Sequence, residues 1–153
     1  MKFLCDQMLG SLAKWLRLMG FDTFYANADM DDDELLQVAK KENRVVITRD
    51  KELMSKMKKQ KLPVIELDVT DVDEQLKIVL KDIVVDPKNV LSRCSVCNTI
   101  LDEIKKKDIQ DKVPRRVFEN NEKFWFCPKC DKIYWMGTHY DKIKNKIDEL
   151  QKH

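Results

Sequence analysis

The first 85 residues alternate between short apolar runs and longer stretches in which apolar residues return every three or four positions. Short runs rich in β-branched and aromatic residues predict buried strands, whereas the longer spacing predicts amphipathic helices. The predicted strands are residues 2–5, 23–26, 44–48 and 64–67. The predicted helices are residues 9–19 (ended by Gly20), 33–40, 51–61 and 73–80. This alternation indicates βαβ units, and we expect an α/β fold with a parallel sheet and helices on both faces.

The pattern changes at Asp86-Pro87, where proline interrupts the helical periodicity. The remainder holds two cysteine pairs, a polar middle at 105–122, an aromatic strand at 124–126 and a charged helix at 140–150. We therefore predict two domains, residues 1–86 and 87–153. A module as small and polar as the second needs an additional stabilising element, such as disulfides or a structural metal, to fold.

The four cysteines of the second part form two C-x-x-C pairs, Cys94 with Cys97 and Cys127 with Cys130. Two such turns can complete a tetrahedral, closed zinc site, which would be structural rather than catalytic. The 29 residues between the pairs indicate an insertion in the ribbon. Disulfides or a redox pair are the alternatives, and a cytoplasmic chain disfavours structural disulfides.

Composition narrows the class of protein. Apolar residues make up 43% of the chain and charged residues 37%. The sequence has no apolar run long enough for a membrane span and no secretory pattern near residue 1, so we expect a soluble, cytoplasmic protein. Residues 1–90 carry a net charge of −2 and residues 91–153 one of +4. That asymmetry is compatible with a basic second part that binds a polyanion and an acidic first part that binds a metal. It is equally compatible with charged residues that are simply solvated.

Acidic residues follow the predicted strands. Asp6, Asp50 and Asp68 come at strand ends, and Asp32 and Asp33 open the second helix. The carboxyl ends of parallel strands share one crevice, and clustered carboxylates need a cation such as magnesium or manganese. Each acid has a simpler explanation, because Asp6, Asp32 and Asp50 could cap helices and Asp68 could lie in a turn.

An ordered set of motifs runs along nearly the whole chain: DQMLG at 6–10, LAKWLR at 12–17, GFDT at 20–23, TRD at 48–50, the cysteine pairs, and YWMGTHY at 134–140. The set resembles the Mut-seven C-terminal RNase domain family, described as a PIN-like nuclease fused to a zinc ribbon. The resemblance implies a metal-dependent ribonuclease in which Asp6, Asp32 and Asp50 fall on the acidic positions. The family often has Ser-His-Trp where this chain has Thr138-His139-Tyr140, which leaves the role of His139 open.

In such an enzyme, metal held by the carboxylates would activate water for attack on an RNA phosphodiester. Basic residues would hold phosphates near the metal or form the electrostatic footprint of the ribbon; the candidates are Lys14, Arg17, Arg49, Arg115 and Arg116. Trp125, Tyr134 and Trp135 could stack on unpaired bases or pack around the zinc site.

Two other functions compete with the ribonuclease. One is a non-catalytic RNA-binding adaptor whose acidic pocket holds no metal. The other is a phosphoacceptor domain, which normally has two acids at the end of its first strand, whereas Asp6 is followed by Gln7. Cleavage of RNA distinguishes the ribonuclease from the adaptor, and acetyl-phosphate labelling would reveal a phosphoacceptor.

Overall fold

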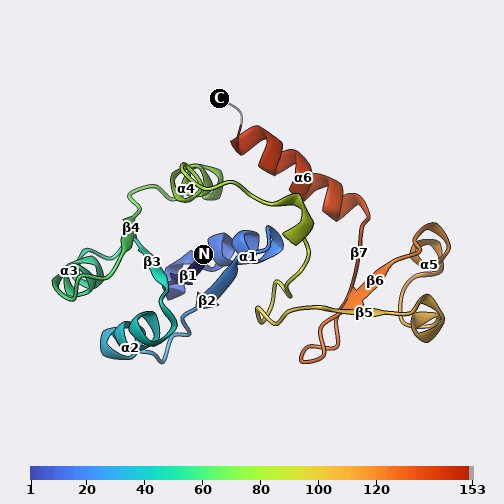
Figure 1. Cartoon of the computed structure of the whole chain (residues 1–153), viewed down its shortest axis with the longest axis horizontal. Helices are drawn as coiled ribbons and strands as arrows, with labels where there is room; N and C mark the ends of the chain where they lie inside the picture. The colour runs from blue at the N-terminus through green and yellow to red at the C-terminus, as the bar shows by residue number, and fades with distance from the viewer. Residues whose placement is uncertain (152–153) are drawn as a thin grey trace.

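A four-stranded parallel sheet forms the centre of the first half of the chain (Figure 1). The structure is a computed structural model and describes residues 1–151. The strands lie in the order β2-β1-β3-β4, and each neighbouring pair is parallel. They are β1 (Lys2–Cys5), β2 (Asp22–Tyr25), β3 (Val45–Thr48) and β4 (Val64–Glu66). The predicted α/β fold with a parallel sheet is confirmed, and each strand end lies within one residue of its prediction.

Helices cover both faces of this sheet, as predicted. They are α1 (Gly10–Leu18), α2 (Asp32–Glu42), α3 (Lys51–Lys59) and α4 (Val72–Val79). Successive side chains of a strand point to opposite faces. Phe3 and Cys5 therefore pack in one cluster with residues of α1 and α4. Leu4, between them, packs in a second cluster with residues of α2 and α3.

The order of the strands creates a switch point between β1 and β3. The chain passes from β1 to β2 on one side through α1, then steps over β1 to β3 through α2 on the other face. The connections from two neighbouring strands therefore diverge. In open α/β sheets, ligands usually bind at the carboxyl ends of strands whose connections diverge in this way.

The second half forms a three-stranded antiparallel ribbon with a long helix that packs back on the first half (Figure 1). Its elements are β5 (Asp102–Ile104), β6 (Phe124–Phe126), β7 (Ile133–Trp135), α5 (Arg115–Asn120) and α6 (Thr138–Leu150). Only β6 and α6 were predicted. All three strands have three residues each, too few to show a period, and β6 was predicted from its three aromatic residues. Within residues 1–151, none of the helices combines the length and apolar character that crossing a bilayer requires.

The apolar core is continuous across the two halves. One cluster joins Leu12 and Leu76 of the sheet domain to Cys94, Tyr134 and Ile143 of the second half. The halves also approach closely at Gly20, which has a φ of 100° and whose added Cβ would lie 2.4 Å from the carbonyl oxygen of Asn89. Only glycine fits such a position. The division into 1–86 and 87–153 thus remains a prediction about domains that share a core.

Candidate functional site

The buried carboxylate of Asp6 lies at the switch point, directly after β1. It is 6% exposed, and one of its oxygens accepts a hydrogen bond from the amide of Met8 at 3.0 Å. Its other oxygen accepts a hydrogen bond from the hydroxyl of Thr48, the last residue of β3. The same hydroxyl accepts the amide N–H of Asp50 at 3.0 Å. A single hydroxyl therefore ties Asp6 to the start of the segment that carries Asp50.

The carboxylate of Asp50 caps helix α3. One oxygen accepts hydrogen bonds from the amides of Glu52 at 2.9 Å and Leu53 at 3.3 Å. Asp6 likewise caps the 3₁₀ helix η1 (Gln7–Leu9). Both acids thus have the capping role that was their simpler explanation, and capping occupies only one oxygen of each.

The remaining acids lie apart from this pair. Asp31, not Asp32, caps α2 by accepting the amide of Glu34 at 2.8 Å, so Asp32 does not have the capping role that was its simpler explanation. Asp32 sits in the first turn and pairs with Lys56 at 3.3 Å. Asp33 is exposed. Asp68 is exposed and borders a hollow beside β4, with a volume of about 970 Å³, which Arg49 and Lys51 on either side of Asp50 also line.

The four cysteines come together. Their sulfur atoms all lie within 4.8 Å of one another, and across residues 1–151 they form the one group of three or more His, Cys, Asp or Glu side chains able to hold a metal ion. Cys97 and Cys127 lie 3.4 Å apart. Four thiolates in one tetrahedral group suit zinc. This cluster confirms the predicted C-terminal fold, which is consistent with a zinc ribbon.

Hydrogen bonds lower the pKa of both thiols of the first pair, Cys94 and Cys97. Burial opposes ionisation of Cys97, but contacts from the hydroxyl and amide of Thr99 outweigh it and lower the pKa of Cys97 to about 6. Burial also opposes ionisation of Cys94, yet the Tyr134 hydroxyl at 3.2 Å lowers the pKa of Cys94. The hydroxyl of Tyr134 in turn accepts the amide of Ser95 at 3.1 Å. Tyr134 is therefore a support of the cysteine cluster, and its side chain is buried.

Arg17 connects α1 to the first cysteine turn. The side chain is 7% exposed. Its Nε donates to the carbonyl of Thr23 at 2.9 Å, and its Nη1 donates to the carbonyls of Val96 at 3.0 Å and Ser95 at 3.3 Å. All these contacts lie inside the molecule and give Arg17 a structural role. Binding of RNA by Arg17 stays a prediction.

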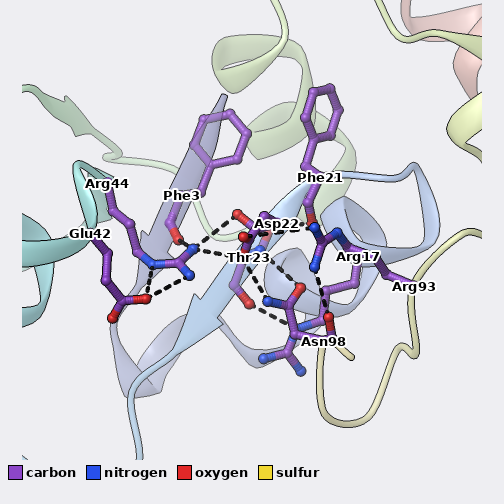
Figure 2. A network of polar contacts seen from close by, with 9 residues as sticks. All are labelled: Phe3, Arg17, Phe21, Asp22, Thr23, Glu42, Arg44, Arg93 and Asn98. Atoms are coloured by element: carbon purple, nitrogen blue, oxygen red, sulfur yellow. Dashed lines mark hydrogen bonds and ion pairs between the residues drawn. The ribbon is translucent and has the colours of Figure 1, made fainter. Parts of the chain in front are cut away.

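A second connection runs through Asn98, which follows the first cysteine pair (Figure 2). Its side chain accepts the amide of Thr23 at 3.0 Å and donates to Asp22 at 2.7 Å. Asp22 also pairs at 2.9 Å with Arg44, which is 5% exposed and donates to the carbonyl of Phe3 at 3.0 Å. This network was not predicted from the sequence, although asparagine at position 98, after a C-x-x-C turn, is a residue type that tolerates the φ of 72° found there.

The family comparison covers both halves of this architecture. The model of the Mut7-C RNAse domain matches residues 1–147. The chain belongs to this family. The suspected resemblance is thereby confirmed. No curated protein sequence and no solved structure is significantly similar to the chain.

The other basic candidates of this Mut7-C chain are scattered. Lys14 is exposed and borders a hollow between α1 and the ribbon. Arg49 is half-buried, and its Nε has no hydrogen-bond partner within residues 1–151. Arg115 pairs with Glu119 at 2.8 Å on α5, where Arg116 is exposed. The structure thus links the Asp6 carboxylate to the backbone amide of Asp50 through the Thr48 hydroxyl, and it leaves the predicted RNA contacts on separate parts of the molecule.

Proposed function

We propose that the chain is a metal-dependent ribonuclease that hydrolyses RNA phosphodiester bonds at the carboxyl edge of its sheet. Membership of the Mut7-C RNAse domain family supports a nuclease-related function with RNA as the substrate. The ribbon would assist by helping to hold the RNA, since residues 91–153 carry a net charge of +4.

The observation that carries this proposal is the buried Asp6 carboxylate at the switch point. Its partners are two neutral donors, the amide of Met8 and the hydroxyl of Thr48, and no ion pair compensates its charge within residues 1–151. A buried carboxylate without a cation is costly. Its oxygens suit a hard divalent cation, so the residues fit magnesium or manganese in type.

Asp6 and Asp50 would hold that cation, Asp50 through the oxygen that capping leaves free and Asp6 through the oxygen that also accepts the Thr48 hydroxyl. Asp32 is the third candidate ligand, and it would have to leave Lys56. Asp33 and Asp68, which are both exposed, are the remaining candidate metal ligands. When bound, the metal would supply an activated water and neutralise charge on the phosphate. Thr48 would fix the spacing of the two carboxylates, and the unpartnered Nε of Arg49 supports a role for this residue in holding phosphate.

Zinc at Cys94, Cys97, Cys127 and Cys130 would be structural, because four protein ligands leave no open position. The first cysteine turn is bonded to α1 through Arg17, which supports a role for the cysteine site in holding the ribbon next to the nuclease domain.

A non-catalytic RNA-binding adaptor is the alternative. One observation favours it: within residues 1–151 the carboxylates do not form a metal-holding group, and Asp6, Asp32 and Asp50 all have other partners. An adaptor would bind RNA equally well with or without magnesium and would leave it intact.

The test is cleavage of end-labelled single-stranded and structured RNAs by zinc-loaded protein, with magnesium, with manganese or without added divalent metal. Asp50→Asn retains the cap and removes a ligand charge. The matched control is Asp86→Asn, which changes the aspartate that caps the 3₁₀ helix η2 (Pro87–Asn89) by accepting the amide of Lys88 at 3.0 Å. We expect Asp50→Asn to lose activity by orders of magnitude and Asp86→Asn to keep it. Wild-type cleavage by Asp50→Asn would refute the metal site.

A further inference from the structure

A second hollow lies between helix α1 and the ribbon, away from the carboxyl edge. It has a volume of about 380 Å³. Both halves of the chain line it: Lys14 and Leu18 come from α1, and Tyr134, Trp135 and His139 come from β7 and α6. Its size falls in the range of small-ligand pockets, roughly 300–1,000 Å³. The proposed nuclease mechanism makes no use of it.

The charge around this hollow has one sign. Lys14 and Lys132 border it together with His139, and no acidic side chain of residues 1–151 does so. Burial, followed by the positive charges of Lys14, Lys132 and Lys142, lowers the pKa of His139. The two lysines around a partly enclosed space favour an anionic ligand. The hollow beside β4 differs, because Glu66 and Asp68 border it.

The rest of the wall is aromatic and apolar. Trp135 is half-buried and shares this wall with Leu18, Leu91 and Ile133. Gly137 fixes where the indole lies, since a Cβ at this position would come within 2.8 Å of its Nε1. The neighbouring Tyr134 cannot swing out, because its hydroxyl bonds Cys94 and Ser95. Trp135 is thus the aromatic surface available to a flat ligand.

We propose that this hollow binds one unpaired nucleotide, with its phosphate near Lys14 and Lys132 and its base against Trp135. Cations and an aromatic face are the two parts of a site for single-stranded nucleic acid. The inference rests on the proposed function for RNA as the natural source of that nucleotide, and a free mononucleotide has the same chemistry. The site would hold an unpaired part of the substrate at the joint between nuclease domain and ribbon.

The test is binding of a fluorescein-labelled twelve-nucleotide oligo(A) to zinc-loaded full-length protein, followed by anisotropy over a series of salt concentrations without magnesium or manganese. Trp135→Ala should weaken binding by about 5-fold or more, the smallest loss expected for one stacked base. Lys14→Ala should make the slope of log K against the logarithm of salt concentration shallower by about 0.7 for each phosphate that the lysine no longer neutralises. Lys132 is also exposed, and Lys132→Ala should have the same effect. The matched control is Lys41→Ala, an exposed lysine on α2, which should change neither quantity.

Competition with 5′-AMP distinguishes the two sources. If AMP displaces the oligonucleotide from wild type and binds Trp135→Ala more weakly, the hollow accepts a free nucleotide. If the oligonucleotide depends on Trp135 and Lys14 but AMP does not compete, the nucleotide must belong to a chain; both results support the site. Wild-type affinity and salt slope in Trp135→Ala, Lys14→Ala and Lys132→Ala would overturn it, as would an equal effect of Lys41→Ala. Because no cleavage is measured, a failure of the nuclease proposal would leave these results interpretable.

Discussion

The hydroxyl of Thr48 donates a hydrogen bond to the carboxylate of Asp6. Because the same hydroxyl accepts the amide N–H of Asp50 at 3.0 Å, the end of β1 and the turn after β3 are held by one oxygen atom. The three residues occupy the place where the sheet connections diverge. The geometry of the proposed catalytic pair therefore depends on a side chain that is neither acidic nor basic.

Thr48→Val tests this dependence. Valine has nearly the same shape but leaves the buried Asp6 carboxylate and the Asp50 amide one partner short, which we expect to cost about 1–3 kcal/mol of unfolding free energy. RNA cleavage should fall with it. Thr48→Ser retains the hydroxyl and should recover both properties, as measured by urea unfolding and by cleavage rates. Equal stability and activity in Thr48→Val would show that the hydroxyl is dispensable.

Asp6→Asn should uncouple stability from metal binding. The single amide oxygen can still accept the Met8 hydrogen bond, and the NH2 group then faces the Thr48 hydroxyl, which can turn to accept from it. Because the uncompensated buried charge disappears as well, the melting temperature without magnesium should hold or rise. Manganese at about 100 times its Kd should stabilise wild type by about 2.7 kcal/mol. It should stabilise Asp6→Asn far less. An identical manganese-induced shift in both proteins would remove Asp6 from the metal site.

The α/β architecture was predictable because each element carries its own period. Short β-branched runs such as residues 45–48 alternate with amphipathic helices, and that alternation defines a parallel sheet. The cysteine cluster was predictable for a similar reason, since two C-x-x-C turns impose their own geometry.

The role of Arg17 could not be predicted from its local sequence. Helical spacing places it beside Lys14, yet Arg17 is buried against the carbonyls of Ser95 and Val96, almost 80 positions later in the chain. Such contacts depend on how the ribbon packs on α1. The shift of the α2 cap from Asp32 to Asp31 has a different cause: three consecutive aspartates carry no local signal that selects one of them.

Zinc removal should affect the whole chain. The cysteine turns share the apolar core of the sheet domain, and Arg17 and Asn98 bond across the junction. Elemental analysis of protein purified without added metal should find about one zinc per chain for a single closed site. Stripping that zinc should lower the melting temperature of helices in both halves in one cooperative transition. Two separate transitions, with the first half unchanged, would show that the halves fold independently.

Low pH should weaken the contact between β2 and the ribbon, in which Asp22 accepts a hydrogen bond from Asn98. Burial opposes ionisation of Asp22, but the hydrogen bond from Asn98 and the Arg44 guanidinium outweigh it and hold the pKa of Asp22 below its usual value. A carboxyl with a lowered pKa in the folded state contributes stability above its unfolded pKa of about 3.9, and this contribution is lost as pH falls through the folded value. At neutral pH the pair with Arg44 is therefore fully present.

Asp22→Asn retains the Asn98 hydrogen bond and removes the charge facing the buried Arg44, which then has only Glu42 as an ion-pair partner within residues 1–151. We expect a loss of about 2 kcal/mol of unfolding free energy at pH 7. Melting curves of wild type and variant, compared at each pH from 7 to 3, should converge below pH 4, because protonation gives wild-type Asp22 the same neutral charge. Protonation of the cysteines affects both proteins and cancels in the difference. Asp111→Asn, at an exposed site of the ribbon, is the control and should match wild type throughout. A difference that stays constant down to pH 3 would mean that the charge of Asp22 does not stabilise the joint.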